Sequence, residues 1–260
     1  MSAPVGLAFD RVGNLYEGDN NSGHVYRFTP DGTRYEFASG LTSPNYVAIG
    51  YSPPGIVCPE PLILECYNGS ATGTIQVGVV DTNGFPLKVI WTVDGKAYQT
   101  NDIPSGGSIT ESVVTFTAVF GEGKHTVVVS ASNGQTAPAS CSTTVSVNDT
   151  LSPTVLAVSG TPDFLWPPNH KMISVNVAVS AIDNCDSSTT AKISRVTCNE
   201  PQGRFAPDWV ITGPLSVDLR AERLGNHDRI YTVYIDVADG NGNKTTTTTT
   251  VTVPQSLKLH

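Results

Sequence analysis

The sequence predicts an all-β protein, and three observations support that prediction. Segments of alternating or β-branched residues recur along the chain between clusters of Gly, Pro, Asn and Asp. No helical period persists for three turns. Charged residues make up only 15% of the 260 residues, against about 25% in an average globular domain. This composition, rich in Thr, Ser, Gly and Val, is typical of exported β-sandwich proteins with polar, uncharged surfaces.

Eight segments have the residue pattern of β-strands. They are residues 74–80, 87–93, 112–120, 125–132, 173–182, 215–222, 229–237 and 245–253. A further short strand is expected over residues 155–158. The threonine run in the last segment resembles low complexity, but Val251 and Val253 continue its alternation. We therefore expect that segment to be a final edge strand.

Two joints divide the chain into parts. The stretch "YSPPGIVCPEP" from Tyr51 is rich in proline, which removes backbone donors and favours extended geometry. The second joint is "VNDTLSPTV" from Val147. The predicted parts are residues 1–50, 57–148 and 149–254, followed by a tail at 255–260.

The five cysteines contain no CxxC spacing. Zinc or thioredoxin-like chemistry is therefore disfavoured, and disulfides formed in an oxidising compartment are expected. An odd number leaves one thiol free. Cys185 and Cys198 flank one loop, and we expect them to form a disulfide across it.

The first part carries a pattern over residues 6–10, 13–16, 19–21, 24–28 and 30–32, which restarts at 41–49. This pattern resembles one blade of an NHL or gluconolactonase-like β-propeller. A propeller closes with about four to eight blades, and a lone blade has two unpaired edges. The resemblance therefore implies a terminal propeller remnant that pairs with the next domain or with a second chain.

In the middle part, the segment "LKVIWTVDG" places Trp91 in mid-strand before a hairpin turn, and "CSTTVSV" supplies a last strand. These segments resemble PKD-like and HYR-like immunoglobulin-fold repeats. Trp91 is expected in the core between two sheets. The HYR-like pattern implies a disulfide between Cys58 and Cys141, which leaves Cys66 free. Pairing of Cys66 with Cys141 stays open as the alternative.

The third part contains the segments "LWPPNHKM", "AIDNCD", "CNEP" and "YTVYIDVADGNGN". With them it resembles a module of secreted multidomain bacterial proteins. The predicted fold is therefore all-β, with a propeller-like blade followed by two tandem immunoglobulin-like β-sandwiches.

The stretch "TPDFLWPPNHKMISV" lies before a predicted strand of the third part. We expect its Pro-Pro turn to carry the chain from one sheet to the other, with Trp166 plugging the sandwich end. Asn169, His170 and Lys171 are expected to cap that turn. The alternative is a ligand-binding role for Trp166, Asn169, His170 and Lys171.

Acidic residues of the third part are expected to meet at one end of its sandwich. In an immunoglobulin-like domain the entry to the first strand and two of its loops converge there. Calcium takes about six to eight hard oxygen ligands. The predicted ligands are Asp149, Asp183, Asn184, Asp186, Asp239 and Asn241. The alternative is that these residues are simply good turn formers.

Catalytic motifs of the GxSxG, HExxH, P-loop and GxGxxG types are absent from the sequence. His170 and His227 are the candidate catalytic residues because both lie near predicted acidic loops. The gluconolactonase-like resemblance implies an alternative function, calcium-dependent hydrolysis of a lactone or ester.

Charge and hydropathy disfavour nucleic-acid binding and membrane insertion. The net charge is −8 and basic residues do not cluster, which disfavours nucleic acid. No apolar run approaches the ~18 residues of a spanning helix, so membrane insertion is not expected. The first residues lack a secretory signal, so either the signal has been removed or export is not used.

The main functional prediction is an extracellular or cell-surface adhesion, ligand-binding or spacer module, stabilised by calcium. Its expected partners are a carbohydrate, cell-surface or small-molecule ligand, and a second chain through edge-strand pairing.

Overall fold

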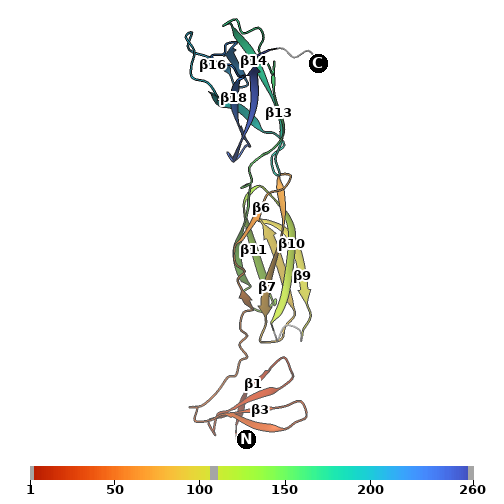
Figure 1. Ribbon diagram of the computed structural model, residues 1–260. Coiled ribbons are helices and arrows are strands. Elements are labelled where there is room, and N and C mark those ends of the chain that lie inside the picture. The colour runs from red at the N-terminus through yellow and green to blue at the C-terminus, as the bar shows by residue number, and fades with distance from the viewer. Residues whose placement is uncertain (1–2, 106–110, 257–260) are drawn as a thin grey trace. The chain divides into compact units, whose positions relative to one another are not determined.

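The computed structural model describes residues 3–105 and 111–256, which form strands β1 to β19 (Figure 1). The predicted all-β class is confirmed. The residues group into two compact units. Unit 1 comprises Met1–Pro61, Thr74–Thr117 and His125–Thr144, and unit 2 comprises Leu62–Gly73, Ala118–Lys124 and Val145–His260.

The first sheet of unit 1 is an antiparallel meander of four strands in chain order. These strands are β1 (Pro4–Phe9), β2 (Leu15–Asp19), β3 (His24–Phe28) and β4 (Arg34–Ala38). Gly6 and Gly18 are paired across β1 and β2. A Cβ atom on Gly6 would lie 2.8 Å from the Cα of Tyr46, so only glycine admits this close backbone approach. The kinship of this meander to a propeller blade stays a prediction.

The middle strands form two sheets with the order β10-β7-β5 and β6-β12-β11-β8-β9. Their bounds are β5 (Gly55–Val57), β6 (Leu62–Glu65), β7 (Ser70–Val80), β8 (Leu87–Val93), β9 (Lys96–Ile103), β10 (Ser112–Gly121), β11 (Gly123–Ser132) and β12 (Ala139–Asn148). This division of strands is immunoglobulin-like, with β8, β11 and β12 as the C, F and G strands.

Two predictions for the middle strands are confirmed. Trp91 is fully buried and stacks on Phe116 of the opposite sheet, with ring centroids 5.0 Å apart. Cys58 and Cys141 form a disulfide whose Cα atoms lie 5.7 Å apart. Both contacts lie within unit 1. They join the two sheets, as expected for an immunoglobulin-like core.

The last strands form a second immunoglobulin-like sandwich within unit 2, with sheets ordered β13-β14-β17-β16 and β15-β18-β19. Their bounds are β13 (Thr154–Thr161), β14 (Met172–Ile182), β15 (Thr190–Cys198), β16 (Trp209–Gly213), β17 (Ser216–Arg220), β18 (Arg229–Ala238) and β19 (Lys244–Val253). The order matches the ABED and CFG sheets of a constant-type domain. The Tyr231 hydroxyl donates to the Arg220 carbonyl at 2.8 Å, as in the tyrosine corner of that fold. Strand β19 lies at a sheet edge, as predicted.

The segment between β13 and β14 corrects one prediction. Strands β13 and β14 are neighbours in one sheet, but between them the chain crosses to the other sheet, where Phe164 forms a parallel bridge with Thr252 of β19. The Pro-Pro turn then leads from that bridge back to β14. Trp166 is 41% exposed, whereas Leu165 is 1% exposed and belongs to the core. Leu165 N donates to the carbonyl of Thr252 in β19 at 2.8 Å. Because successive side chains of an extended segment point to opposite sides, burying Leu165 turns Trp166 outward.

Candidate metal site

Three acidic loops of unit 2 converge. Asp149 follows β12, Asp183 and Asp186 follow β14, and Asp239 follows β18. One carboxylate oxygen from each of Asp149, Asp183 and Asp186 lies within 4.8 Å of the others. We refer to Asp149, Asp183, Asp186 and Asp239 as the acidic cluster. The immunoglobulin-like topology brings these loops together because the ends of its strands share one end of the sandwich.

Three of these carboxylates are each held through one oxygen. Asp183 Oδ1 accepts hydrogen bonds from the backbone N of Cys185 at 2.8 Å and of Asp186 at 3.0 Å. Asp239 Oδ1 accepts from Asn243 N at 2.8 Å. Asp149 Oδ2 accepts from Asn241 Nδ2 at 3.3 Å. The loop backbone and the amides thus fix the orientation of these three side chains.

The other oxygen of each of these three carboxylates is buried without a partner. Among the described residues, Asp149 Oδ1, Asp183 Oδ2 and Asp239 Oδ2 have no hydrogen-bond donor. Asp149 and Asp239 are only 8% and 7% exposed. A buried, unpaired carboxylate oxygen is costly, and a bound cation would compensate it.

The electrostatics of Asp149 also favour a bound cation. Burial raises the pKa of the Asp149 carboxyl, and the charges of Asp183 and Asp239 raise it further against the hydrogen bond from Asn241. Burial and like charges both disfavour the ionised form. A divalent cation would reverse this balance, because it favours ionised carboxylates.

The remaining predicted ligands lie at the rim. Asn241 is exposed, and its amide also donates to Glu122 Oε1 at 2.7 Å. Asn184 instead donates its side-chain amide to the carbonyl of Cys66 at 2.6 Å. Sequence reasoning missed Glu122, which forms a second group with Asp186 and Cys185. Its only local signal was an acid in the turn "GEGK".

The second disulfide lies beside this cluster and corrects the predicted pairing. Cys185 pairs with Cys66, with Cα atoms 5.2 Å apart, and Cys198 is the free thiol. The prediction of a Cys185–Cys198 disulfide was therefore wrong, as were a free Cys66 and a Cys66–Cys141 pair. Strand β15, nine residues long, runs between Cys185 and Cys198. At about 3.3 Å per residue, it carries Cys198 far from the loop that holds Cys185.

The candidate catalytic histidines lie in other loops, each beside its own glutamate. His170 Nδ1 is 3.1 Å from Glu222 Oε2, and His227 Nε2 is 3.4 Å from Glu200 Oε1. Both imidazoles are largely exposed, and both glutamates are buried. Asn169 Oδ1 accepts from Lys171 N at 3.2 Å, which is the capping bond expected in this turn.

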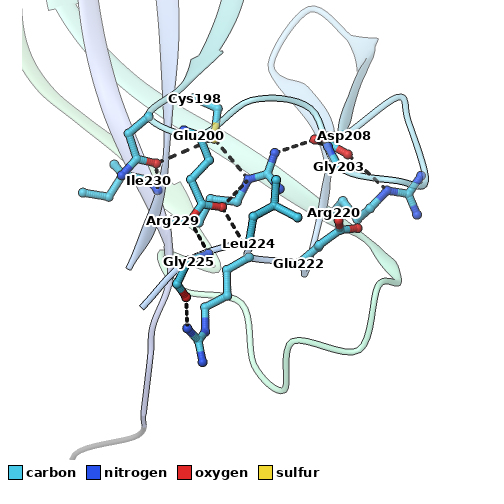
Figure 2. Close-up of polar contacts among 12 residues, drawn as sticks. Cys198, Glu200, Gly203, Asp208, Arg220, Glu222, Leu224, Gly225, Arg229 and Ile230 are labelled. Atoms are coloured by element: carbon cyan, nitrogen blue, oxygen red, sulfur yellow. Dashed lines mark hydrogen bonds and ion pairs between the residues drawn. The ribbon is translucent and has the colours of Figure 1, made fainter. Parts of the chain in front are cut away.

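Figure 2 shows a buried ionic network that includes Glu200, the glutamate paired with His227. Arg229 is fully buried, and its Nη2 pairs with Asp208 Oδ2 while its Nε donates to Cys198 Sγ at 3.1 Å. Glu200 accepts from the backbone N of Leu224 and of Gly225. The network therefore links the loops that follow β15 and β17.

Sequence reasoning missed this network, although one signal was present. Arg229 lies on the buried face of β18, together with Tyr231 and Val233. An arginine at an inward position of an alternating strand needs a buried acid as its partner. The partner acids come from loops distant in sequence.

No protein-family model matches this chain, and no curated protein matches it. Among solved structures, Sidekick-1 immunoglobulin domains 1–4 are 14% identical, with 93% of this chain and 58% of that chain covered and a TM-score of 0.35. The Ig1-2 module of Drosophila receptor protein tyrosine phosphatase DLAR is 12% identical over 77% of this chain and 97% of that chain, with a TM-score of 0.28. Fibronectin(III)-like modules of Clostridium thermocellum CbhA are 14% identical over 80% and 97%, with a TM-score of 0.26. Scores this low carry no argument, so the immunoglobulin-like class rests on the strand order.

Within the described residues, no helix has the length and apolar character needed to cross a membrane.

Proposed function

We propose that this chain is a calcium-stabilised adhesion, ligand-binding or spacer module of an extracellular or cell-surface protein. One observation carries the calcium part: three loops that contribute to the acidic cluster each hold a carboxylate with one buried, unpartnered oxygen. Two disulfides support an oxidising compartment. The immunoglobulin-like strand order supplies a rigid scaffold for these loops.

The acidic cluster would hold the ion, with Glu122 and Asn241 at its rim. These side chains supply hard carboxylate and amide oxygens, the donor type that calcium prefers. A bound ion would neutralise the mutual repulsion of the carboxylates. It would also fasten the segment around Asp149 to the loops that follow β14 and β18.

Calcium fits this donor set better than magnesium. Magnesium demands a small, near-ideal octahedron and retains several waters, whereas calcium accepts varied numbers of carboxylates at longer distances. Extracellular calcium modules bind with dissociation constants of about 10⁻⁴ to 10⁻³ M. We expect an affinity in that range.

The test is a calcium titration of the whole chain. Isothermal titration calorimetry should register calcium binding, and thermal denaturation should show a higher melting temperature in calcium than in EDTA. At a free calcium concentration of about 100 times Kd, the stabilisation should be about 2.7 kcal/mol. Magnesium at the same concentration is the matched control. Absence of both heat and a melting shift at millimolar calcium would contradict the proposal.

The proposal also covers the kind of protein to which this chain belongs and the class of ligand that it binds. The sequence resemblances imply a secreted bacterial multidomain protein with an NHL-like blade and PKD-like or HYR-like modules. A carbohydrate or cell-surface ligand is supported by the exposed Trp166 beside the polar Asn169, His170 and Lys171. Pairing with a second chain is supported by β1, an edge strand with exposed Val5, Leu7 and Phe9.

A further inference from the structure

We infer that the Cys66–Cys185 disulfide regulates the acidic cluster: its reduction weakens calcium binding, and bound calcium protects it from reduction. This inference rests on the proposed calcium site. It adds a redox control of that site through one of the two disulfides.

The disulfide is part of the metal loop itself. Cys185 lies between Asp183 and Asp186, and its backbone N donates to Asp183 Oδ1 at 2.8 Å. Its Sγ lies within 4.8 Å of carboxylate oxygens of Glu122 and Asp186. Any displacement of Cys185 therefore moves the neighbouring carboxylates.

The partner cysteine belongs to a loop that contacts both acidic segments. Glu65 accepts hydrogen bonds from Thr150 N at 2.9 Å and Thr150 Oγ1 at 2.6 Å, next to Asp149. The loop also contacts Asn184: Asn68 N donates to the Asn184 carbonyl at 2.7 Å, and the Asn184 amide donates to the Cys66 carbonyl. Residues 65–68 thus hold the Asp149 segment and the Asp183 loop together, and the S–S bond is the covalent link.

When the disulfide is broken, the hydrogen bonds described above must oppose the mutual repulsion of the carboxylates in the acidic cluster without its help. Cys66 and Cys185 are 119 residues apart in sequence, so the disulfide closes a long loop. Without it, calcium binding must itself order the two segments, and that ordering cost reduces the affinity.

The redox step is an ordinary thiol–disulfide exchange. The S–S bond takes two electrons and two protons from a dithiol such as dithiothreitol and becomes two thiols, while the dithiol is oxidised to its cyclic disulfide. Both sulfurs are buried, since Cys66 is 0% and Cys185 is 7% exposed. By linkage, the factor by which reduction lowers calcium affinity is the factor by which calcium disfavours reduction.

The first test compares calcium affinities of the wild type, the Cys66→Ala/Cys185→Ala variant and the Cys58→Ala/Cys141→Ala variant. Calorimetry should show calcium binding weakened between about 5-fold and 150-fold in the first variant. The second variant is the matched control, because its disulfide belongs to unit 1 and the acidic cluster belongs to unit 2. It should keep the wild-type affinity. Circular dichroism checks that both variants are folded.

The second test uses the wild type alone, and it decides the question if a variant does not fold. The protein is equilibrated in mixtures of reduced and oxidised dithiothreitol, with calcium or with EDTA, and its thiols are then alkylated and mapped by mass spectrometry. Calcium should shift Cys66–Cys185 toward the oxidised form and leave Cys58–Cys141 unchanged. Equal calcium affinity with and without the Cys66–Cys185 disulfide, or a calcium-independent redox equilibrium, overturns the inference while the calcium site stands. Absence of calcium binding to the wild type overturns both.

Discussion

Asn241 Nδ2 donates to Asp149 Oδ2 at 3.3 Å and to Glu122 Oε1 at 2.7 Å. One amide thus joins carboxylates from two segments that are distant in sequence. It leaves Asp149 Oδ1 buried without a donor. Asp149 is therefore the residue whose replacement most directly tests the acidic cluster.

Asp149→Asn should abolish the calcium-induced rise in melting temperature, because it removes one buried anionic ligand. In EDTA the same variant should be at least as stable as the wild type, since it removes a charge disfavoured by burial and by neighbouring acids. Differential scanning calorimetry in EDTA and in millimolar calcium measures both effects. The control is Asp102→Asn, an exposed carboxylate 3.8 Å from Lys88, which should change neither. An intact calcium response in Asp149→Asn would exclude this residue as a ligand.

The raised pKa of Asp149 predicts a pH dependence in metal-free protein. In the folded state Asp149 keeps its proton above the ordinary pKa of 3.8. Ionised Asp149 destabilises the folded state, so this destabilisation is absent below that pH and grows as pH rises through the raised pKa. Glu65 acts in the opposite sense, because hydrogen bonds from Thr150 lower its pKa and its stabilisation is lost in acid.

The Asp149 contribution is therefore read as the stability of the wild type minus that of Asp149→Asn. Urea denaturation in EDTA should show this difference falling as pH rises from about 4 to 7. Calcium should reverse the trend. A difference that rises with pH in EDTA would mean that the Asp149 pKa is lowered.

Leu165→Ala should destabilise the protein by about 2–5 kcal/mol, because it removes a buried core side chain. Trp166→Ala should cost less than about 1 kcal/mol, since the indole is exposed. Chemical denaturation of the two variants provides the comparison. The reverse order of stabilities would restore Trp166 as the core residue of this segment.

Arg229→Ala should cost about 3–5 kcal/mol, because it removes the cation paired with Asp208 Oδ2 and leaves that fully buried carboxylate only the longer contact with Arg220, at 3.6 Å. Arg195→Ala is the control. That guanidinium stacks 3.8 Å from the ring centroid of Tyr234 on an exposed part of β15, and its loss should cost about 1 kcal/mol or less. Equal losses in the two variants would argue against a structural role for the buried network.

His170→Ala and His227→Ala test the hydrolase alternative. We expect both variants to match the wild type in assays on lactones and p-nitrophenyl esters, with and without chelator, because each imidazole pairs with a glutamate in a structural loop. A general base contributes about 10²- to 10⁴-fold to a rate. A chelator-sensitive wild-type rate that falls about tenfold or more in either variant, at unchanged melting temperature, would favour an enzyme.

Local pattern was sufficient to predict the eight strands with clear alternation, together with Trp91 as a core residue. It missed β5, β6, β9, β15 and β16, which bury few or no residues. A strand that buries few side chains needs little alternation of apolar and polar residues, so its sequence pattern is weak. Acidic and amide residues in turns also indicated the metal loops, because calcium ligands and turn formers share residue types.

The sequence by itself determined where the chain is extended and which loops carry acids, since both depend on neighbouring residues. Only the tertiary structure decided that Cys66 pairs with Cys185, that Leu165 rather than Trp166 is buried, and that Arg229 finds Asp208. It also placed Glu122 beside Asn241. Each of these outcomes depends on which distant segments the sandwich brings together, and strand periodicity contains no information about such long-range pairing.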